Sequence, residues 1–193
     1  MLEGQVVNLR ALEVTDAERV YRWVNDRDVT RFTSARYPYS MADEEVWLRD
    51  MAMNSYGDGV RLAIETKAGE HIGTLELRET RSEDRKAELA VTIGEKGYWS
   101  RGYGTDAVLT ALRFAFHEMN LNRVWLTTME YNSRAIACYK KCGFSDEGRL
   151  RQETFKGGRY WDFTIMGVLR REFEALHDAQ LLEGGSDASG TAS

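Results

Sequence analysis

A glycine-containing segment between two predicted elements constrains this chain more than any other feature of its sequence. The segment reads GYWSRGYGT over residues 97–105 and joins a run of predicted strands to a long predicted helix. Gly102 and Gly104 let the backbone approach a ligand closely, and Arg101 adds a positive charge. The first amides of a helix present unpaired N–H donors to an anion such as a pyrophosphate. Strand-to-helix connections also use glycine for geometry alone, so the segment predicts either a pyrophosphate site or a simple turn.

The same segment lacks the marks of two common nucleotide-binding loops. No Gly-Lys-Ser or Gly-Lys-Thr ending follows it, which excludes a P-loop. A dinucleotide fingerprint is disfavoured because a third glycine is missing and the preceding strands are predicted to be antiparallel. A nicotinamide dehydrogenase is therefore disfavoured. Pyrophosphate remains the expected ligand, but the loop alone does not identify the molecule that carries it.

Two helix starts are predicted in the N-terminal part of the chain. Thr15 and Glu18 have the spacing of a capping box and predict a helix that ends near residue 26. Ser40 and Asp43 predict the start of a second helix. The segment 25–39 between them, which contains the single proline, is expected to be a loop or a broken helix.

The periodicity of the whole chain predicts an α+β fold. Two further helices are predicted, one over 104–120 with an apolar stripe at helical spacing and one over 132–143. The predicted strands lie at residues 6–10, 60–66, 71–80, 86–94, 124–129, 144–155 and 160–169. We therefore predict a single domain with a mixed, mostly antiparallel twisted sheet of about six to seven strands flanked by about four helices.

Composition limits the class of protein. A chain of 193 residues with 42% hydrophobic residues suits one core, which we place in residues 1–180, while the glycine- and serine-rich residues 181–193 predict a disordered tail. No run of about 20 apolar residues occurs and the charged start lacks a signal-peptide core, so we expect a soluble cytoplasmic protein without a membrane partner. The net charge of −5 argues against nucleic acid as a partner and is compatible with a cationic one.

A second motif follows the glycine segment, and together they resemble the GNAT superfamily. That family carries Gln/Arg-x-x-Gly-x-Gly/Ala, then a strand, then Asn-x-x-Ala-x-x-x-Tyr-x-x-x-Gly-Phe. This chain supplies Gly102 and Gly104, then Asn132, Ala135, Tyr139, Gly143 and Phe144. The resemblance covers most of the chain, from about Val6 to Phe173.

One position departs from the family pattern. Trp99 stands where Gln or Arg is usual. Tryptophan there resembles the subgroup of ribosomal-protein N-terminal acetyltransferases and spermidine acetyltransferases, as do the segments NLRAL at 8–12 and FKGGRY at 155–160.

The resemblance implies a GNAT fold and an acetyl-CoA-dependent N-acetyltransferase that transfers the acetyl group directly to an amine. The implied acceptor is a protein amino terminus or a polyamine, with an aminoglycoside-type antibiotic third, and no metal is implied. The pantetheine arm of coenzyme A and the thioester carbonyl would be held by backbone amides near Val91, Thr92 and Ile93. The implied pyrophosphate site consists of Arg101, Gly102, Tyr103, Gly104 and Thr105. Asn132 would bond the pantetheine, although its position also predicts a plain helix cap.

Two side chains are candidates for proton transfer. Tyr139 lies about two helical turns after Asn132, so both can face one cleft, and the family uses this tyrosine to protonate the departing thiolate. Glu88 is our candidate for the general base, since some GNAT enzymes carry a glutamate at this point. The plain alternatives are a packed aromatic for Tyr139 and a glutamate on a wet strand face for Glu88.

Cys138 and Cys142 are expected to be small, partly buried helix residues, and a covalent acetyl carrier at Cys138 is disfavoured because the family favours direct transfer. The different class of function that stays open is a coenzyme A-binding regulatory module without catalysis.

In this family the divergent early segment, here about 25–56, shapes the acceptor site. Four of its residues are candidates to line that site: Arg31, Phe32, Tyr37 and Tyr39. Dimers are common in the subgroup, so a homodimer is compatible with the sequence.

Overall fold

The computed structural model describes residues 1–53, 59–81 and 83–184. The strands are β1 (Leu2–Glu3), β2 (Val7–Ala11), β3 (Gly59–Thr66), β4 (His71–Arg81), β5 (Lys86–Ile93), β6 (Arg123–Met129), β7 (Ser145–Lys156) and β8 (Arg159–Leu169). The α-helices are α1 (Ala17–Asn25), α2 (Arg27–Thr30), α3 (Met41–Met53), α4 (Tyr103–Arg113), α5 (Ser133–Lys141) and α6 (Arg170–Gly184). Short 3-10 turns lie at η1 (Val14–Asp16) and η2 (Lys96–Tyr98), and a π-helical turn, η3 (Phe114–Glu118), continues α4.

The described strands form one eight-stranded sheet in the order β1-β2-β3-β4-β5-β6-β8-β7. Every neighbouring pair is antiparallel except β5 and β6, which are parallel. The pairing of β5 with β6 begins at Lys86 and ends at Glu88, although β5 continues to Ile93 and β6 to Met129. The two strands therefore diverge and open a gap in the middle of the sheet.

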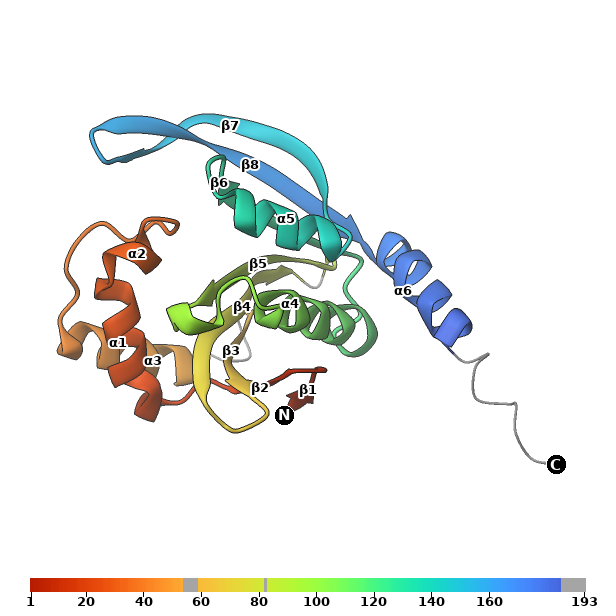
Figure 1. Ribbon diagram of the computed structural model, residues 1–193, viewed down its shortest axis with the longest axis horizontal. Coiled ribbons are helices and arrows are strands. Elements are labelled where there is room, and N and C mark those ends of the chain that lie inside the picture. The colour runs from red at the N-terminus through yellow and green to blue at the C-terminus, as the bar shows by residue number, and fades with distance from the viewer. Residues whose placement is uncertain (54–58, 82, 185–193) are drawn as a thin grey trace.

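Helices cover both faces of the sheet. Figure 1 shows α4 and α5 together in front of the sheet. Helices α1, α2 and α3 form a group beside the C-terminal end of β5. In α4 the predicted apolar stripe is confirmed, because Val108, Ala111 and Leu112 are fully buried against the strands. On the opposite face Trp23 and Leu48 form a second, smaller cluster.

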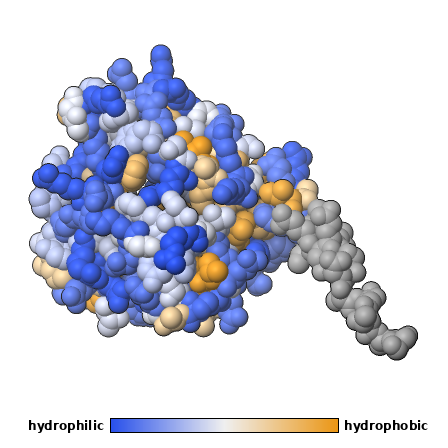
Figure 2. All heavy atoms as spheres, in the orientation of Figure 1, coloured by the Kyte–Doolittle hydropathy of each residue, from blue (hydrophilic) through white to orange (hydrophobic). Residues whose placement is uncertain are grey.

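The outer surface matches this internal packing. Figure 2 shows a face that is mainly hydrophilic, with hydrophobic residues in small separate groups. The large apolar side chains are thus used mainly in the two clusters between sheet and helices.

Most predicted elements are confirmed. The antiparallel meander is β3, β4 and β5, and the closing hairpin is β7 and β8. The cap at the start of α3 is also confirmed, since the Asp43 amide donates to the Ser40 hydroxyl and the Ser40 amide donates to the Asp43 carboxylate.

Three details differ from the predictions. The additional strand β1 is too short to show any periodicity. The long helix leaves α-helical geometry at Phe114, where the π-helical turn begins. The predicted capping box of Thr15 and Glu18 is wrong, because the carboxylate of Asp16 accepts the Glu13 amide at 2.9 Å and the 3-10 turn η1 precedes α1.

The C-terminal helix is not among the elements predicted from the sequence. Helix α6 extends to Gly184 and so includes the first residues of the segment expected to be a tail. The rest of that segment, 185–193, lies outside the described residues. Among the described helices, none has the length and apolar character needed to cross a bilayer.

Candidate active site

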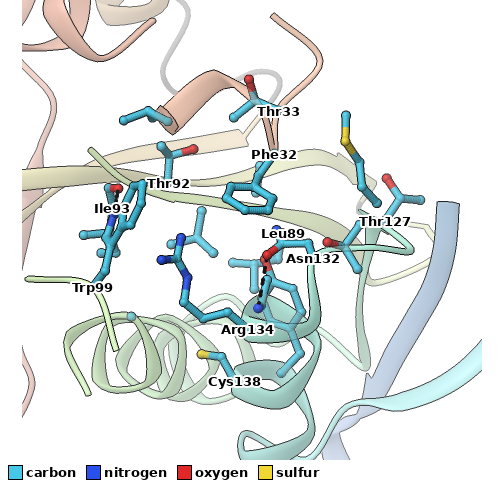
Figure 3. A pocket seen from close by; sticks show the side chains of 18 of the residues that line it. Phe32, Thr33, Leu89, Thr92, Ile93, Trp99, Thr127, Asn132, Arg134 and Cys138 are labelled. Atoms are coloured by element: carbon cyan, nitrogen blue, oxygen red, sulfur yellow. Dashed lines mark hydrogen bonds between the residues drawn. The ribbon is translucent and has the colours of Figure 1, made fainter. Parts of the chain in front are cut away.

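A cavity of about 360 Å³ lies in the gap between β5 and β6. Its walls come from α2 and the loop after it, from β5 and the loop into α4, and from β6 and the first turns of α5. Figure 3 shows side chains from these segments converging on one space. The cavity therefore brings together the two sequence motifs, which are separated in the chain by most of α4, by η3 and by β6.

The free edge of β5 presents backbone groups to this cavity. The Thr92 carbonyl faces β4, since a Cβ placed on Gly73 would lie 2.2 Å from that oxygen. The Ile93 carbonyl points the opposite way and accepts a 2.7 Å hydrogen bond from the Trp99 indole. Because backbone groups alternate along a strand, the amides of Val91 and Ile93 face the gap. Of the predicted pantetheine-binding residues, Val91 and Ile93 thus offer backbone amides, and Thr92 lines the cavity with its side chain (Figure 3).

The start of α4 has the geometry of an anion cradle. Gly102 is the N-cap residue, has a φ of +89° and makes no side-chain cap. The first helical hydrogen bond runs from the Asp106 amide to the Gly102 carbonyl, so the amides of Tyr103, Gly104 and Thr105 have no helical acceptor before them. A Cβ on Gly102 would meet nothing within 4 Å, which leaves open space above these amides. The donor set fits the phosphates of coenzyme A.

Two of the residues predicted for this loop are not among those that line the cavity. Gly102, Gly104 and Thr105 line the cavity, whereas Arg101 and Tyr103 do not. The Arg101 guanidinium donates to the Gly97 carbonyl at 3.1 Å and lies 5.9 Å from the Tyr103 ring. The positive charge of Arg101 is therefore held beside the loop that leads into α4.

The carboxylate of Asp106, in the first turn of α4, holds this helix in place. Asp106 is buried and accepts hydrogen bonds from the amides of Gln5, Val6 and Val7 at 2.7–3.0 Å. These bonds tie the first turn of α4 to the turn between β1 and β2 and to the first residue of β2. The start of α4 is thus anchored to the N-terminal part of the sheet.

Asn132 starts α5 and also lines the cavity. Its Oδ1 accepts the Ala135 amide at 3.3 Å, which confirms the predicted helix cap. The residue is 8% exposed. Because Oδ1 is used by the cap, the side-chain amide NH₂ is the group left to bond a ligand.

Tyr139 lies on α5 at the base of the cavity and is 7% exposed. Burial, together with the neighbouring thiols of Cys138 and Cys142, raises its pKa well above the usual range. The residue packs against Phe144, and its hydroxyl makes no hydrogen bond to another described residue. Tyr139 is therefore a packed aromatic that lines the cavity, and its raised pKa keeps the phenol neutral.

Glu88 lines the cavity at the point where β5 and β6 separate. It is 8% exposed, so it does not lie on a wet strand face. Its two oxygens accept from the Arg78 guanidinium at 3.0 and 3.2 Å. Two of about four lone-pair sites on the carboxylate are thus used, and the others can bind water.

The two cysteines form a pair on α5. Cys138 lines the cavity and its sulfur lies 3.3 Å from the Thr105 hydroxyl. Hydrogen bonds from the Cys142 thiol and from Thr105 lower the pKa of Cys138, and the same contact and burial raise the pKa of Cys142. The Cys138 thiol is therefore packed beside the cradle, as expected of a partly buried helix residue.

The segment after α2 forms the opposite wall. Of the four candidates from this segment, Phe32 lines the cavity and Arg31 lies over its ring at 4.8 Å. Tyr37 and Tyr39 were wrongly expected to line it; they are 77% and 40% exposed and lie outside the cavity. The backbone of Tyr39 is instead hydrogen-bonded to the side chain of Asn25 at the end of α1.

Sequence reasoning missed Arg134. Its guanidinium lies 4.0 Å from the Trp99 ring and 5.5 Å from the Phe32 ring, and Figure 3 shows it between the two. A basic residue in the first turn of a helix opposes the helix dipole, and that mismatch was the signal available in the sequence.

Comparisons with known proteins agree with this geometry. Residues 7–145 match the family described as "Acetyltransferase (GNAT) domain". Spermidine N(1)-acetyltransferase of Escherichia coli (strain K12) is 32% identical over 177 residues, which cover 92% of this chain and 93% of that protein. A putative ribosomal N-acetyltransferase of Bacillus subtilis, YdaF, is 28% identical over 174 residues, covering 87% and 93%. The crystal structure of spermidine N-acetyltransferase from Vibrio cholerae in complex with CoA and spermine superimposes with a TM-score of 0.80 at 28% identity, covering 86% of this chain and 97% of that one.

Proposed function

Because the chain belongs to the GNAT acetyltransferase family and is an acetyl-CoA-dependent N-acetyltransferase, we propose that it transfers the acetyl group in a ternary complex, with Tyr139 as proton donor and Glu88 as proton acceptor. The observation that carries this proposal is the cavity at the β5–β6 gap, which both residues line together with the α4 cradle.

The cradle would bind the diphosphate of acetyl-CoA. Its donors are the amides of Tyr103, Gly104 and Thr105 at the N-terminus of α4, where the helix dipole favours negative charge. The pantetheine arm would then run along the free edge of β5, where the amides of Val91 and Ile93 can bond it like a short additional strand. Asn132 would donate its side-chain N–H groups from the other wall.

The β5 edge would also act on the thioester. An amide of this edge donating to the thioester oxygen would stabilise the negative charge that develops there during attack. The amine nitrogen forms a bond to the acetyl carbon, and the carbon–sulfur bond then breaks. The Tyr139 phenol would give its proton to the departing sulfur and recover one from solvent.

The amine must lose a proton to react. A lysine-like amine has a pKa near about 10.4, so at neutral pH it arrives protonated. Glu88 would take this proton through a water molecule bound at its remaining lone pairs. Arg78, in a bidentate contact, fixes the orientation of the carboxylate.

Two acceptor classes are supported by the relatives, a polyamine by the spermidine acetyltransferases and a protein amino terminus by the putative ribosomal enzyme. An aminoglycoside-type antibiotic is a third. A coenzyme A-binding module without catalysis is the alternative from another class. The Tyr139 residue at the cavity argues against it, since its hydroxyl is not hydrogen-bonded to any described residue.

The test is release of free thiol from acetyl-CoA, measured against a panel of amines, with calorimetric titration of acetyl-CoA in parallel. Turnover with at least one amine, together with binding, supports the proposal. Binding without turnover on polyamines, peptide termini or aminoglycosides would favour the regulatory module.

A further inference from the structure

The wall of the cavity opposite the β5 edge carries unusual charge. Arg31 and Arg134 approach the same ring, Phe32, at 4.8 and 5.5 Å. Arg134 lines the cavity and is stacked on Trp99. Two guanidinium groups therefore flank one aromatic side chain at the mouth of the site.

Within the described part of the chain, neither arginine takes part in an ion pair. The acids of the neighbouring strands are already used, because Glu130 and Asp162 both pair with Arg149. Among the described residues that line the cavity, the only acid is Glu88, which pairs with Arg78. Burial and the charge of Arg31 lower the pKa of Arg134, as expected when like charges face each other without a counter-ion.

The hairpin of β7 and β8 adds further positive charge to this mouth. The Lys156 ammonium donates to the carbonyls of Thr30, Thr33 and Ala35 at 2.6–2.9 Å, so all three of its N–H donors are used. Figure 1 shows the hairpin reaching over α5 toward α2. Lys156 thus holds the loop that carries Phe32, and its ammonium lies next to Thr33, which lines the cavity.

Two more arginines lie at the same junction. Arg36 donates to the Thr154 hydroxyl at 2.7 Å, and Arg159 lies 3.5 Å from the Trp161 ring. Neither forms an ion pair with a described residue. The mouth of the cavity is therefore basic, although the chain as a whole has a formal charge of −5.

We infer that the acceptor is an amine that carries carboxylate groups close to the reacting nitrogen, such as an acidic peptide amino terminus or a free acidic amino acid, and not a polyamine. A second ammonium close to a guanidinium is repelled, whereas a carboxylate at the same distance is attracted, and both effects are larger near a protein surface than in bulk water. Arg31 and Arg134 each offer a planar fork of N–H donors suited to a carboxylate. This inference rests on the proposed acetyl transfer and names its substrate class.

The experiment compares kcat/KM for acceptors that differ in charge. The panel contains short peptides with the same terminal alanine followed by two glutamates, two glutamines or two lysines, and also free glutamate and spermidine. We expect the glutamate peptide to exceed the lysine peptide by on the order of tenfold or more, with spermidine among the poorest acceptors. Raising the salt concentration should reduce the difference in kcat/KM between the acidic and the basic acceptors, because salt screens the arginine charges at the mouth of the cavity. A rate for free glutamate equal to that of the acidic peptide identifies a small-molecule acceptor, and a lower rate identifies a peptide; both support the inference.

Variants separate an acceptor role from a role toward the phosphates of coenzyme A. Arg31→Gln and Arg134→Gln should each raise KM for the acidic acceptor on the order of tenfold, because each removes one charge-assisted contact. The Kd of acetyl-CoA should stay within about twofold of the wild-type value. Arg27→Gln is the matched control and should change neither constant, because Arg27 is an exposed arginine of α2, the short helix before Arg31, and lies outside the cavity.

Three results would overturn the inference. Faster acetylation of spermidine than of the acidic peptide would overturn it and leave the proposed acetyl transfer intact. A rise in the acetyl-CoA Kd with unchanged acceptor KM in Arg31→Gln and Arg134→Gln would assign the charges to the cofactor. Absence of turnover with every amine, despite acetyl-CoA binding, would overturn the proposed function and this inference with it.

Discussion

The indole N–H of Trp99 donates a 2.7 Å hydrogen bond to the carbonyl oxygen of Ile93, the last residue of β5. This bond occupies the end of the strand edge that faces the cavity, where β6 has already diverged. The Arg134 guanidinium covers the other side of the ring at 4.0 Å. The tryptophan that replaces the usual Gln or Arg therefore holds the edge on which the thioester would lie.

Trp99→Phe should loosen this edge while keeping an aromatic ring beneath Arg134. Loss of one hydrogen bond lowers the free energy of unfolding by about 1 kcal/mol, and we expect kcat/KM to fall on the order of tenfold. Trp23→Phe is the matched control, because its indole donates to Glu95 at 3.1 Å in the second cluster, outside the cavity. Equal kinetic effects of the two substitutions, measured by thiol release, would contradict a specific role for Trp99.

Tyr139→Phe should lower kcat by about 10²- to 10⁴-fold, the usual contribution of a general acid, without changing the Kd of acetyl-CoA. Because the pKa of Tyr139 is raised, its proton stays in place as pH rises, and the wild-type rate should not fall between pH 8 and about pH 10, where an ordinary tyrosine begins to ionise. Tyr160→Phe, at an exposed tyrosine of the hairpin, should have no effect. A parallel loss of binding and turnover would remove Tyr139 as the acid.

Glu88→Gln should depress the rate most at low pH, since the amine then depends most on a base to remove its proton. Rate profiles of wild type and variant between pH 6 and about pH 10 check this, because they should converge as the free amine becomes abundant. Profiles that run parallel over the whole pH range would exclude Glu88 as the general base and would limit its role to the ion pair with Arg78.

Gly102→Ala should weaken acetyl-CoA binding by on the order of tenfold, because the new methyl group would occupy the open space above the cradle. The left-handed backbone also costs about 1–2 kcal/mol for alanine. Gly69→Ala controls for that strain, since Gly69 has a φ of +81° and equally free surroundings in a distant turn. Calorimetric titration of both variants should show weakened binding only for Gly102→Ala; an unchanged Kd there would contradict the cradle.

Asp16→Asn should destabilise the fold by about 3 kcal/mol at pH 7, because it breaks a buried ion pair. Burial opposes ionisation of Asp16, but its hydrogen bond with Arg10 at 2.7 Å and the approach of the His71 ring at 3.1 Å hold its pKa well below the usual range. A carboxyl whose pKa is lower in the folded state stabilises above the unfolded pKa of about 3.9 and loses this effect as pH falls further.

The difference in unfolding free energy between wild type and Asp16→Asn, measured by urea titration, should therefore be constant from pH 7 to about pH 5 and shrink below about pH 4. The exposed Asp28, paired with Lys96, offers the control Asp28→Asn, which should leave the urea midpoint nearly unchanged. A difference that does not depend on pH would mean that the charge of Asp16 contributes nothing.

Local patterns determined the elements of this protein and its two motifs. The spacing of apolar residues gave α4, the glycines at 102 and 143 mark turns with positive φ, and Asn132 caps α5 as its residue type suggests. These features depend on neighbours within a few positions, so the sequence alone carries them.

Tertiary structure alone decided how the site is charged and which backbone groups it uses. The pairing of Glu88 with Arg78, the approach of Arg31 and Arg134 to Phe32, and the divergence of β5 from β6 join segments that are distant in the chain. Arg36 and Thr154, for example, are 118 positions apart and yet hydrogen-bonded. Net charge sums over the whole surface, whereas a ligand responds to the few charges within about 10 Å of it, and only the fold selects which charges those are.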